Sequence, residues 1–170
     1  MTRGSAVWTP AYIGLGSNLE NPATQVAAAI DRIAKLPESS LQSVSSLYSS
    51  RPMGPENQPD FVNAVACLLT KMPARRLLDE LLAIELAAGR RRDGERWGPR
   101  VLDLDLLMYG RQQIDEATLT VPHPGIAERN FVLFPLREIA PHAHVPGLGS
   151  VNALADRLPV DDFDIARLDP

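Results

Sequence analysis

The sequence is short of cysteine and of long apolar runs, and each shortage excludes a class of structure. Its one cysteine, Cys67, cannot form an intramolecular disulfide, which fits a reducing compartment. No apolar run approaches the length that spans a membrane, and residues 1–9 lack the apolar stretch of a secretion signal. We therefore expect a cytoplasmic protein that has no membrane partner.

The charge balance is slightly acidic, with 21 acidic residues against 17 basic ones and a net charge of −4. Such a balance gives no support to a general role in nucleic-acid binding. The length of 170 residues suits one domain, and the hydrophobic content of 45% is typical of a soluble globular protein. We expect a single domain over residues 1–170, with a loose lead-in at 1–9 and a peripheral acidic tail at 160–170. We also expect a monomer whose partners are small-molecule substrates.

Residues 101–108 have the two-residue period of a strand that carries a pair of acids. One face of this strand is predicted to carry Leu102, Leu104, Leu106 and Met108, and the other Val101, Asp103, Asp105 and Leu107. The two aspartates then sit side by side, with Cα atoms about 6–7 Å apart. Like charges on one face repel, and a cation such as Mg²⁺, which prefers carboxylate oxygens, reverses that cost. The alternative interpretation is that both aspartates lie on the solvent-exposed face of an edge strand and bind nothing.

Arginine is concentrated immediately before this strand. Five of the 15 arginines fall between residues 90 and 100, namely Arg90, Arg91, Arg92, Arg96 and Arg100. Guanidinium groups grip phosphate oxygens through paired hydrogen bonds, so arginines beside metal-binding carboxylates indicate phosphoryl transfer. The alternative interpretation is that these arginines lie in a solvated loop, and that their number reflects the general preference of this chain for arginine over lysine.

The pattern of apolar residues and breakers predicts an α+β fold. The expected strands are 11–16, 41–48, 61–69 and 101–108, with a hairpin return at 112–115, and the expected helices are 22–35, 73–88, 130–139 and 150–158. Asn21 is expected to cap the first helix, and Gly14 with Gly16 is interpreted as a tight turn. The order of strands and helices is that of a ferredoxin-like split βαβ sandwich, an antiparallel sheet with helices on one face. This fold hosts many functions and does not choose one.

Three further residues stand out from their surroundings. Asn63 is the polar residue of an otherwise apolar strand, and it is either a satisfied structural amide or a reader of a heterocycle edge. Glu85 edges onto the apolar face of its helix, as a surface carboxylate or as a partner of an arginine or a ligand hydroxyl. His123 is held in a non-helical loop by prolines on both sides. His142 and His144 lack a third ligand and are interpreted as structural.

Several segments together resemble the 6-hydroxymethyl-7,8-dihydropterin pyrophosphokinase family. The resemblance runs from Tyr12 to about Pro146, and its segments are Gly-Leu-Gly-Ser-Asn-Leu (14–19), Gln-Pro-Asp-Phe-Val-Asn (58–63), Ile-Glu (84–85), Gly-Arg-Arg-Arg (89–92), Arg-Trp-Gly-Pro-Arg-Val-Leu-Asp-Leu-Asp-Leu (96–106), Val-Pro-His-Pro (121–124) and Phe-Val-Leu-Phe-Pro-Leu (131–136). It implies transfer of pyrophosphate from ATP to the pterin hydroxymethyl group in folate biosynthesis, with release of AMP. It also implies Mg²⁺, with two ions bridging the phosphates.

The resemblance assigns roles by position. Asp103 and Asp105 become the ligands of both Mg²⁺ ions, and Arg90 and Arg100 become phosphate contacts on a loop that closes over the substrates. The positions that line the ATP site in the family are Glu85, Arg92, Trp97, Leu106, Thr120, His123 and Arg129. The positions that line the pterin site are Ser50, Met53, Phe61, Asn63 and Phe131, with the two phenylalanines sandwiching the ring and the amide reading its edge.

Two positions depart from the family pattern, and two other functions compete with it. Ser50 stands where many members have threonine, and Gly125 where an arginine is common, which removes one positive charge near the nucleotide. A metal-dependent nucleotidyl transferase or nuclease would also use paired acids. A non-catalytic sensor on the same fold would bind nucleotide without consuming it. The reaction products distinguish the three functions, because only the kinase yields AMP and a pyrophosphorylated pterin.

Overall fold

A five-strand path with one branch forms the central sheet of the protein. The structure is a computed structural model, and it describes residues 7–52, 54, 57–89, 101–159 and 164–168. The middle strand β4 (Phe61–Thr70) pairs on one side with β1 (Thr9–Ser17), which in turn pairs with β5 (Asp103–Tyr109). On its other side β4 pairs with β2 (Ser39–Val44) and β3 (Tyr48–Ser50), and β10 (Ile165–Arg167) pairs with β3. All these pairings are antiparallel, so the predicted ferredoxin-like arrangement is confirmed.

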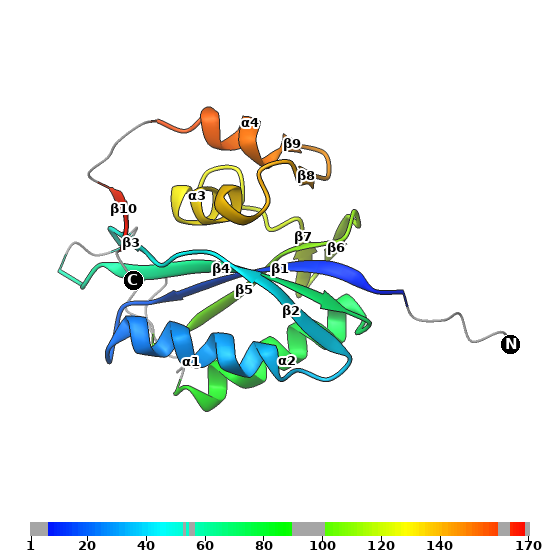
Figure 1. Ribbon diagram of the computed structural model, residues 1–170, viewed down its shortest axis with the longest axis horizontal. Coiled ribbons are helices and arrows are strands. Elements are labelled where there is room, and N and C mark those ends of the chain that lie inside the picture. Colours follow the sequence, from blue (N-terminus) through cyan, green and yellow to red (C-terminus); the bar gives the residue numbers. More distant parts are fainter. Residues whose placement is uncertain (1–6, 53, 55–56, 90–100, 160–163, 169–170) are drawn as a thin grey trace, which may run out of the picture.

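Helices cover both faces of the sheet (Figure 1). One face packs against α1 (Pro22–Ala34) and α2 (Ala74–Ala87), as expected from the split βαβ order. The other face lies beneath α3 (Asn130–Ile139) and α4 (Val151–Asp156), so the expectation of helices on one face alone is wrong. The reason lies in β4, which is apolar on both faces and therefore needs a cover on each side.

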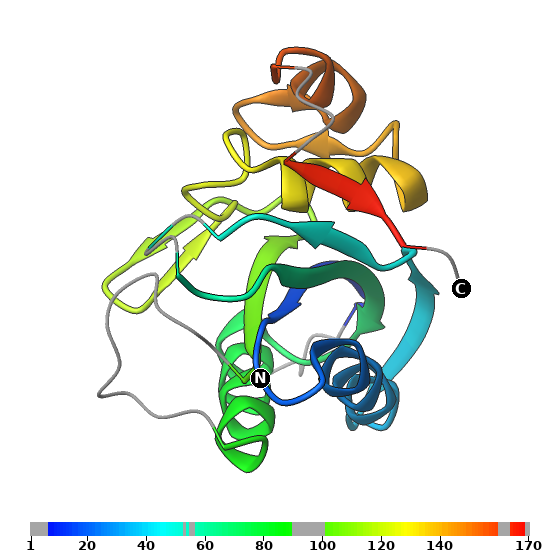
Figure 2. The same ribbon diagram turned by 90° about the vertical axis from the view of Figure 1, so that its left-hand side faces the viewer.

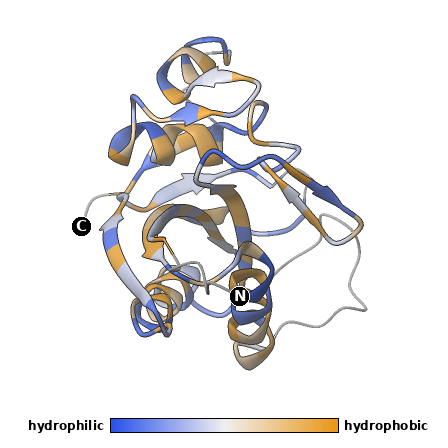
Figure 3. Cartoon of the chain, turned by 90° about the vertical axis from the view of Figure 1, so that its right-hand side faces the viewer, coloured by the Kyte–Doolittle hydropathy of each residue, from blue (hydrophilic) through white to orange (hydrophobic). Residues whose placement is uncertain are grey.

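Each helical layer encloses its own hydrophobic cluster. The cluster under α1 and α2 includes Ile13, Ile33, Leu68, Leu77, Leu81, Leu104 and Leu106. The cluster under α3 and α4 includes Val65, Leu107, Met108, Leu133, Leu136 and Leu154. Burying one such side chain contributes about 1.5–3 kcal/mol. Hydrophobic residues follow the central strands and alternate with hydrophilic ones along the helices (Figure 3).

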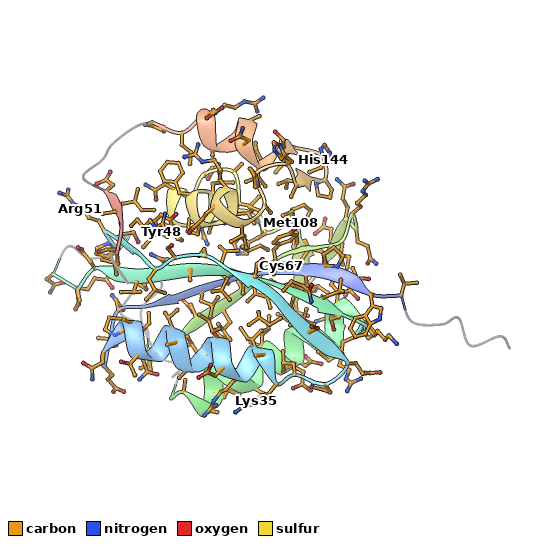
Figure 4. All side chains as sticks on the ribbon, viewed as in Figure 1. Lys35, Tyr48, Arg51, Cys67, Met108 and His144 are labelled. Carbon is orange, nitrogen blue, oxygen red and sulfur yellow. The ribbon has the colours of Figure 1, made fainter. Side chains whose placement is uncertain are left out.

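A β-bulge interrupts the alternation of β5. Ile13 pairs with Leu106 and Tyr12 pairs with Met108, which leaves Leu107 as the extra residue. Leu107 and Met108 both pack in the cluster under α3, where Figure 4 labels Met108, whereas Leu106 packs under α1 and α2. The prediction that Met108 shares a face with Leu106 is therefore wrong. A strict two-residue period contains no bulge, and only the pairing with β1 reveals it.

The predicted strand 41–48 is two strands, β2 and β3, broken between Val44 and Tyr48. At the break, Ser45 donates its backbone N–H to the Val65 carbonyl oxygen and accepts the Val65 N–H on Oγ. Glu138 of α3 accepts the backbone N–H and the hydroxyl of Ser46 and the hydroxyl of Tyr48, at 2.9, 2.6 and 2.9 Å. The α3 side of the sheet, where Figure 4 labels Tyr48, therefore fixes the start of β3.

Two smaller expectations about local structure need correction. The 112–115 segment does not pair back on the acidic strand, because β6 (Ile114–Glu116) pairs with β7 (Leu119–Val121). Asn21 stands at the cap position with φ 60°, but its side chain makes no capping hydrogen bond. The first hydrogen bond of α1 is instead accepted by the Asn21 backbone carbonyl from the Gln25 N–H.

The expected peripheral tail contributes to the sheet, because β10 extends it beside β3 (Figure 2). The remaining pair of short strands, β8 (His144–Val145) and β9 (Gly149–Ser150), leads into α4. Among the described residues no helix is long and apolar enough to cross a membrane.

Candidate active site

The acids and the amide predicted from the sequence meet on one face of the sheet, on either side of β1. Gly16 of β1 pairs with Asp103 of β5 on one side and with Asn63 of β4 on the other, and Gly14 pairs with Asp105. Directly paired residues point to the same face, so all three polar side chains face the α3 layer. Gly14 and Gly16 are therefore strand residues, and their interpretation as a tight turn is wrong. Glycine inside a strand is typical of a close approach by another group.

Asp105 lies within reach of two basic side chains. Its Oδ1 is 4.0 Å from His123 Nε2, and its Oδ2 is 3.9 Å from Arg129 Nη1. The Asp105 side chain is 43% exposed, so an incoming cation can still reach its oxygens. Burial lowers the pKa of His123, Asp105 opposes this and Arg129 adds to it, so the imidazole is neutral near pH 7. His123 Nδ1 accepts the Gly125 N–H at 3.1 Å, which leaves the proton on Nε2, toward Asp105.

The donor set at the acids suits Mg²⁺ shared with a substrate. Within the described ranges no group of three or more His, Cys, Asp and Glu side chains forms a closed metal cage. Two carboxylates on one face leave most coordination positions to other oxygens, and Mg²⁺ is commonly held by one or two carboxylates together with substrate phosphates. The chemistry of Asp103 and Asp105 therefore fits a Mg²⁺ ion whose other ligands would be phosphate or water oxygens.

Glu85 fastens α2 to the acidic strand. Its side chain is only 1% exposed, and Oε2 accepts the backbone N–H of Leu104 at 3.1 Å. Of the alternatives left by the sequence, a surface carboxylate is excluded. Because Leu104 stands between Asp103 and Asp105, this hydrogen bond holds the backbone from which both acids project.

The other predicted nucleotide positions are only partly brought together. Thr120 lies half-buried on β7, and the His123 N–H donates to the Leu107 carbonyl oxygen of β5, which places the loop after β7 beside the acids. Leu106 is 4% exposed and packs under α1 and α2, so its side chain points away from Asp105. The predicted residues Arg90, Arg92, Trp97, Arg100 and Met53 lie outside the described residues.

Three of the predicted pterin residues, Ser50, Phe61 and Asn63, lie together at the start of β4. Asn63 is 4% exposed, and its Nδ2 donates to Ser50 Oγ at 2.6 Å. Phe61, two residues earlier on the same face, pairs with Ser50 across to β3. Phe131 belongs to α3, the helix that covers this face, and the Arg129 guanidinium lies 5.7 Å from its ring centroid.

A comparison with models of protein families identifies the family of this chain. The model of the 7,8-dihydro-6-hydroxymethylpterin-pyrophosphokinase (HPPK) family matches residues 12–141. The chain belongs to this family. The match covers the described part of the site, from β1 through α3.

Individual HPPK relatives agree with this membership. The chain is 52% identical to the 2-amino-4-hydroxy-6-hydroxymethyldihydropteridine pyrophosphokinase of Pseudomonas aeruginosa over 135 residues, 79% of this chain and 83% of the relative. It is 44% identical to the enzyme of the same name from Haemophilus influenzae over 160 residues, 94% and 98% of the two chains. A crystal structure of Plasmodium falciparum HPPK-DHPS has the same fold, with a TM-score of 0.71 at 12% identity. That likeness covers 91% of this chain and 46% of the longer one.

One pair of buried polar residues at the HPPK site escaped the sequence reasoning. Asn18, only 1% exposed, donates Nδ2 to Gln58 Oε1 and to the Pro59 carbonyl oxygen, both at 3.0 Å. These bonds hold the chain that leads into β4 against the end of β1. The two residues stand 40 positions apart, so no local spacing connects them. Both lie in segments that carry the resemblance, which was the available signal.

Proposed function

We propose that this protein carries out the HPPK reaction with Mg²⁺ bound at Asp103 and Asp105. As a member of its family, the protein transfers pyrophosphate to hydroxymethyldihydropterin in folate biosynthesis, with ATP as co-substrate. The dependence on Mg²⁺, the two ions and the individual residue roles are the proposal. One observation carries it: Gly16 pairs with both Asp103 and Asn63, so one acid and the amide flank a single position of β1, and the second acid, Asp105, pairs with Gly14 on the same face.

The chemistry is a displacement at the β-phosphorus of ATP. The pterin hydroxyl oxygen forms a bond to this phosphorus, the bond from it to the α,β-bridging oxygen breaks, and AMP leaves with that oxygen. The hydroxyl proton passes to solvent or to a phosphate oxygen, and no side chain is assigned as the base, since positioning and electrostatics suffice. Two Mg²⁺ ions, when bound, neutralise the phosphates and orient the attacking oxygen.

The chain's own residues position the two substrates. His123, Arg129 and Thr120 are proposed to border the nucleotide beside the acids, whereas Glu85 and Leu106 are buried on the α2 side and are proposed only to support the acidic strand. Arg90, Arg92, Trp97 and Arg100 are proposed to bind phosphates and base, and their loop to close when both substrates are present. Phe61 and Phe131 are proposed to enclose the pterin, with Asn63, Ser50 and Met53 along its edge.

Product analysis tests the proposal directly. The protein is incubated with ATP, Mg²⁺ and 6-hydroxymethyl-7,8-dihydropterin, and the products are identified by mass. AMP together with the pterin diphosphate supports the kinase. Free pyrophosphate points to a nucleotidyl transferase, and unchanged ATP points to a binding protein. A parallel incubation after chelation of divalent ions, followed by stepwise return of Mg²⁺, tests the metal: full activity without Mg²⁺ contradicts it.

A further inference from the structure

Gly16 lies so close to two proposed pterin residues that any side chain at position 16 would contact them. A Cβ atom built on Gly16 would lie 3.2 Å from Asn63 Oδ1 and 3.8 Å from Phe61 Cδ1. Both neighbours belong to the proposed pterin site and both come from β4, the strand paired with β1. A distance of 3.2 Å is tighter than nearly all real Cβ contacts, so the amide of Asn63 would have to move by a few tenths of an ångström.

The amide of Asn63 has little room to move. Its Nδ2 is held by Ser50 Oγ at 2.6 Å, and Asn63 and Ser50 are each 4% exposed. Ser50 is fixed in turn, because β3 pairs with β4 on one side and with Ile165 of β10 on the other. The amide is therefore held between the Ser50 hydroxyl and the bare backbone of Gly16. A methyl group at position 16 would tilt the amide plane or weaken the bond to Ser50.

We propose that Gly16 is a positioning residue for pterin recognition, whose missing side chain sets the orientation of the Asn63 amide. The inference rests on the proposed assignment of Asn63 and Phe61 to the pterin. An amide recognises a donor–acceptor edge only when its oxygen and nitrogen point along the two hydrogen bonds, so a small rotation weakens both. Among the described residues outside its chain neighbours, a Cβ at position 16 would meet only Asn63 and Phe61 within 4 Å, so its direct effect falls on the proposed pterin side.

Gly14 supplies a matched control in the same strand. It belongs to the same face two residues earlier, and the three described atoms nearest to its Cβ would all be Leu107 side-chain atoms at 3.4–3.6 Å, which is ordinary contact. Neither glycine has a positive φ, so alanine suits the backbone at both positions. Alanine in place of glycine inside a strand also lowers the conformational entropy lost on folding, so neither substitution is expected to destabilise the fold.

The experiment compares Gly16→Ala, Gly14→Ala, Asn63→Ala and the unchanged protein by melting temperature and by KM for each substrate. For Gly16→Ala we expect the KM of the pterin to rise roughly tenfold or more, because sub-ångström misplacement at a site is costly. The KM of ATP should stay within about twofold, since no ATP contact of the chain is altered. Gly14→Ala should match the unchanged protein in the KM of the pterin, and both glycine variants should melt near it, whereas Asn63→Ala loses a buried hydrogen bond and should melt lower.

A double-mutant cycle separates positioning from a general effect on structure. If Gly16 acts through the amide, Gly16→Ala should add little to the pterin KM once Asn63 is alanine. Full additivity, an equal rise in the KM of ATP, or an unchanged pterin KM for Gly16→Ala would each overturn the inference. If Asn63→Ala itself leaves the pterin KM unchanged, the site assignment fails instead. A pterin KM that rises for Asn63→Ala and not for Gly16→Ala removes only the role of Gly16.

Discussion

A Cβ atom on Gly125 would lie 2.7 Å from Nε and 3.0 Å from Cζ of Arg129. The Arg129 side chain thus lies directly over the Gly125 backbone and extends toward Asp105. Its Nη1 is 3.9 Å from Oδ2 of Asp105. The resemblance led us to expect one positive charge fewer near the nucleotide, because Gly125 replaces a common arginine. In the structure Arg129 fills the space that a side chain at position 125 would enter.

Gly125→Ala is therefore expected to displace Arg129 and to raise the KM of ATP severalfold. Stability should change little, because the atoms that must move are the far end of a flexible side chain and Gly125 lacks a positive φ. Steady-state kinetics with varied ATP measures the effect, and Arg129→Ala gives its upper limit. Gly125→Ala should add little in the Arg129→Ala background, and a full additional loss there would contradict this explanation.

Replacing either acid by its neutral amide should abolish most of the activity. Asp103→Asn and Asp105→Asn keep the side-chain shape but remove the charge that binds Mg²⁺, so kcat should fall by about a hundredfold or more. Asp31→Asn, on the solvent side of α1, is the matched control and should retain full activity. The measurement is AMP formation over a range of Mg²⁺ concentrations, in variants whose melting temperatures show a folded protein. Undiminished turnover in a folded Asp105→Asn variant contradicts the proposed metal site.

Glu85→Ala should destabilise the protein more than Glu85→Gln. Removing the carboxylate leaves the buried Leu104 N–H without its acceptor, which costs about 1–3 kcal/mol of unfolding free energy. Glutamine can still accept that bond, so the amide variant should recover part of the loss. Urea unfolding of both variants measures the difference. Asp79→Ala, exposed on the same helix, should not lower the unfolding free energy, because alanine is the best helix former, and an equal loss there would contradict the role of the buried bond.

Glu138 should make stability depend on pH in acid solution. Burial alone would raise the pKa of Glu138, but hydrogen bonds from Ser46 and Tyr48 and the charge of Arg167 outweigh it, so the pKa lies below its usual value. A carboxyl with a depressed pKa stabilises the fold above its unfolded pKa, about 4.3, and loses that contribution as pH falls through the folded value.

Unfolding free energies measured from pH 7 downward should therefore fall less for Glu138→Gln than for the unchanged protein below about pH 4.3. Tyr48→Phe, which removes one of the donors, should lie between the two. Identical pH profiles for all three proteins would show that the bonds of Glu138 add nothing to stability.

The sequence was informative where a local pattern carries the signal. The alternation from Leu102 to Leu106 places both acids on one face, and the polar Asn63 in an apolar strand marks a buried amide. These predictions need only the two-residue period of a strand. The order of elements likewise predicts the sheet, because short connections limit the possible topologies.

What the sequence did not reveal depends on pairing between distant strands. The bulge at Leu107 exists only relative to Tyr12 and Ile13 of β1, and the role of Gly16 follows from its two partners across the sheet. The bonds of Glu138 to Ser46 span 92 positions, and no periodicity links the two. The second helical layer was missed because the apolar character of β4 does not by itself say which later helix covers it.

The order of elements along the chain also decides when the site can form. A ribosome delivers β1, β3 and β4, with Ser50 and Asn63, before β5 with Asp103 and Asp105, and α3 with Phe131 follows later. Domains generally fold as units, and one edge of β1 stays open until β5 pairs with it. The amide, the acids and Phe131 therefore come together only after synthesis has passed α3.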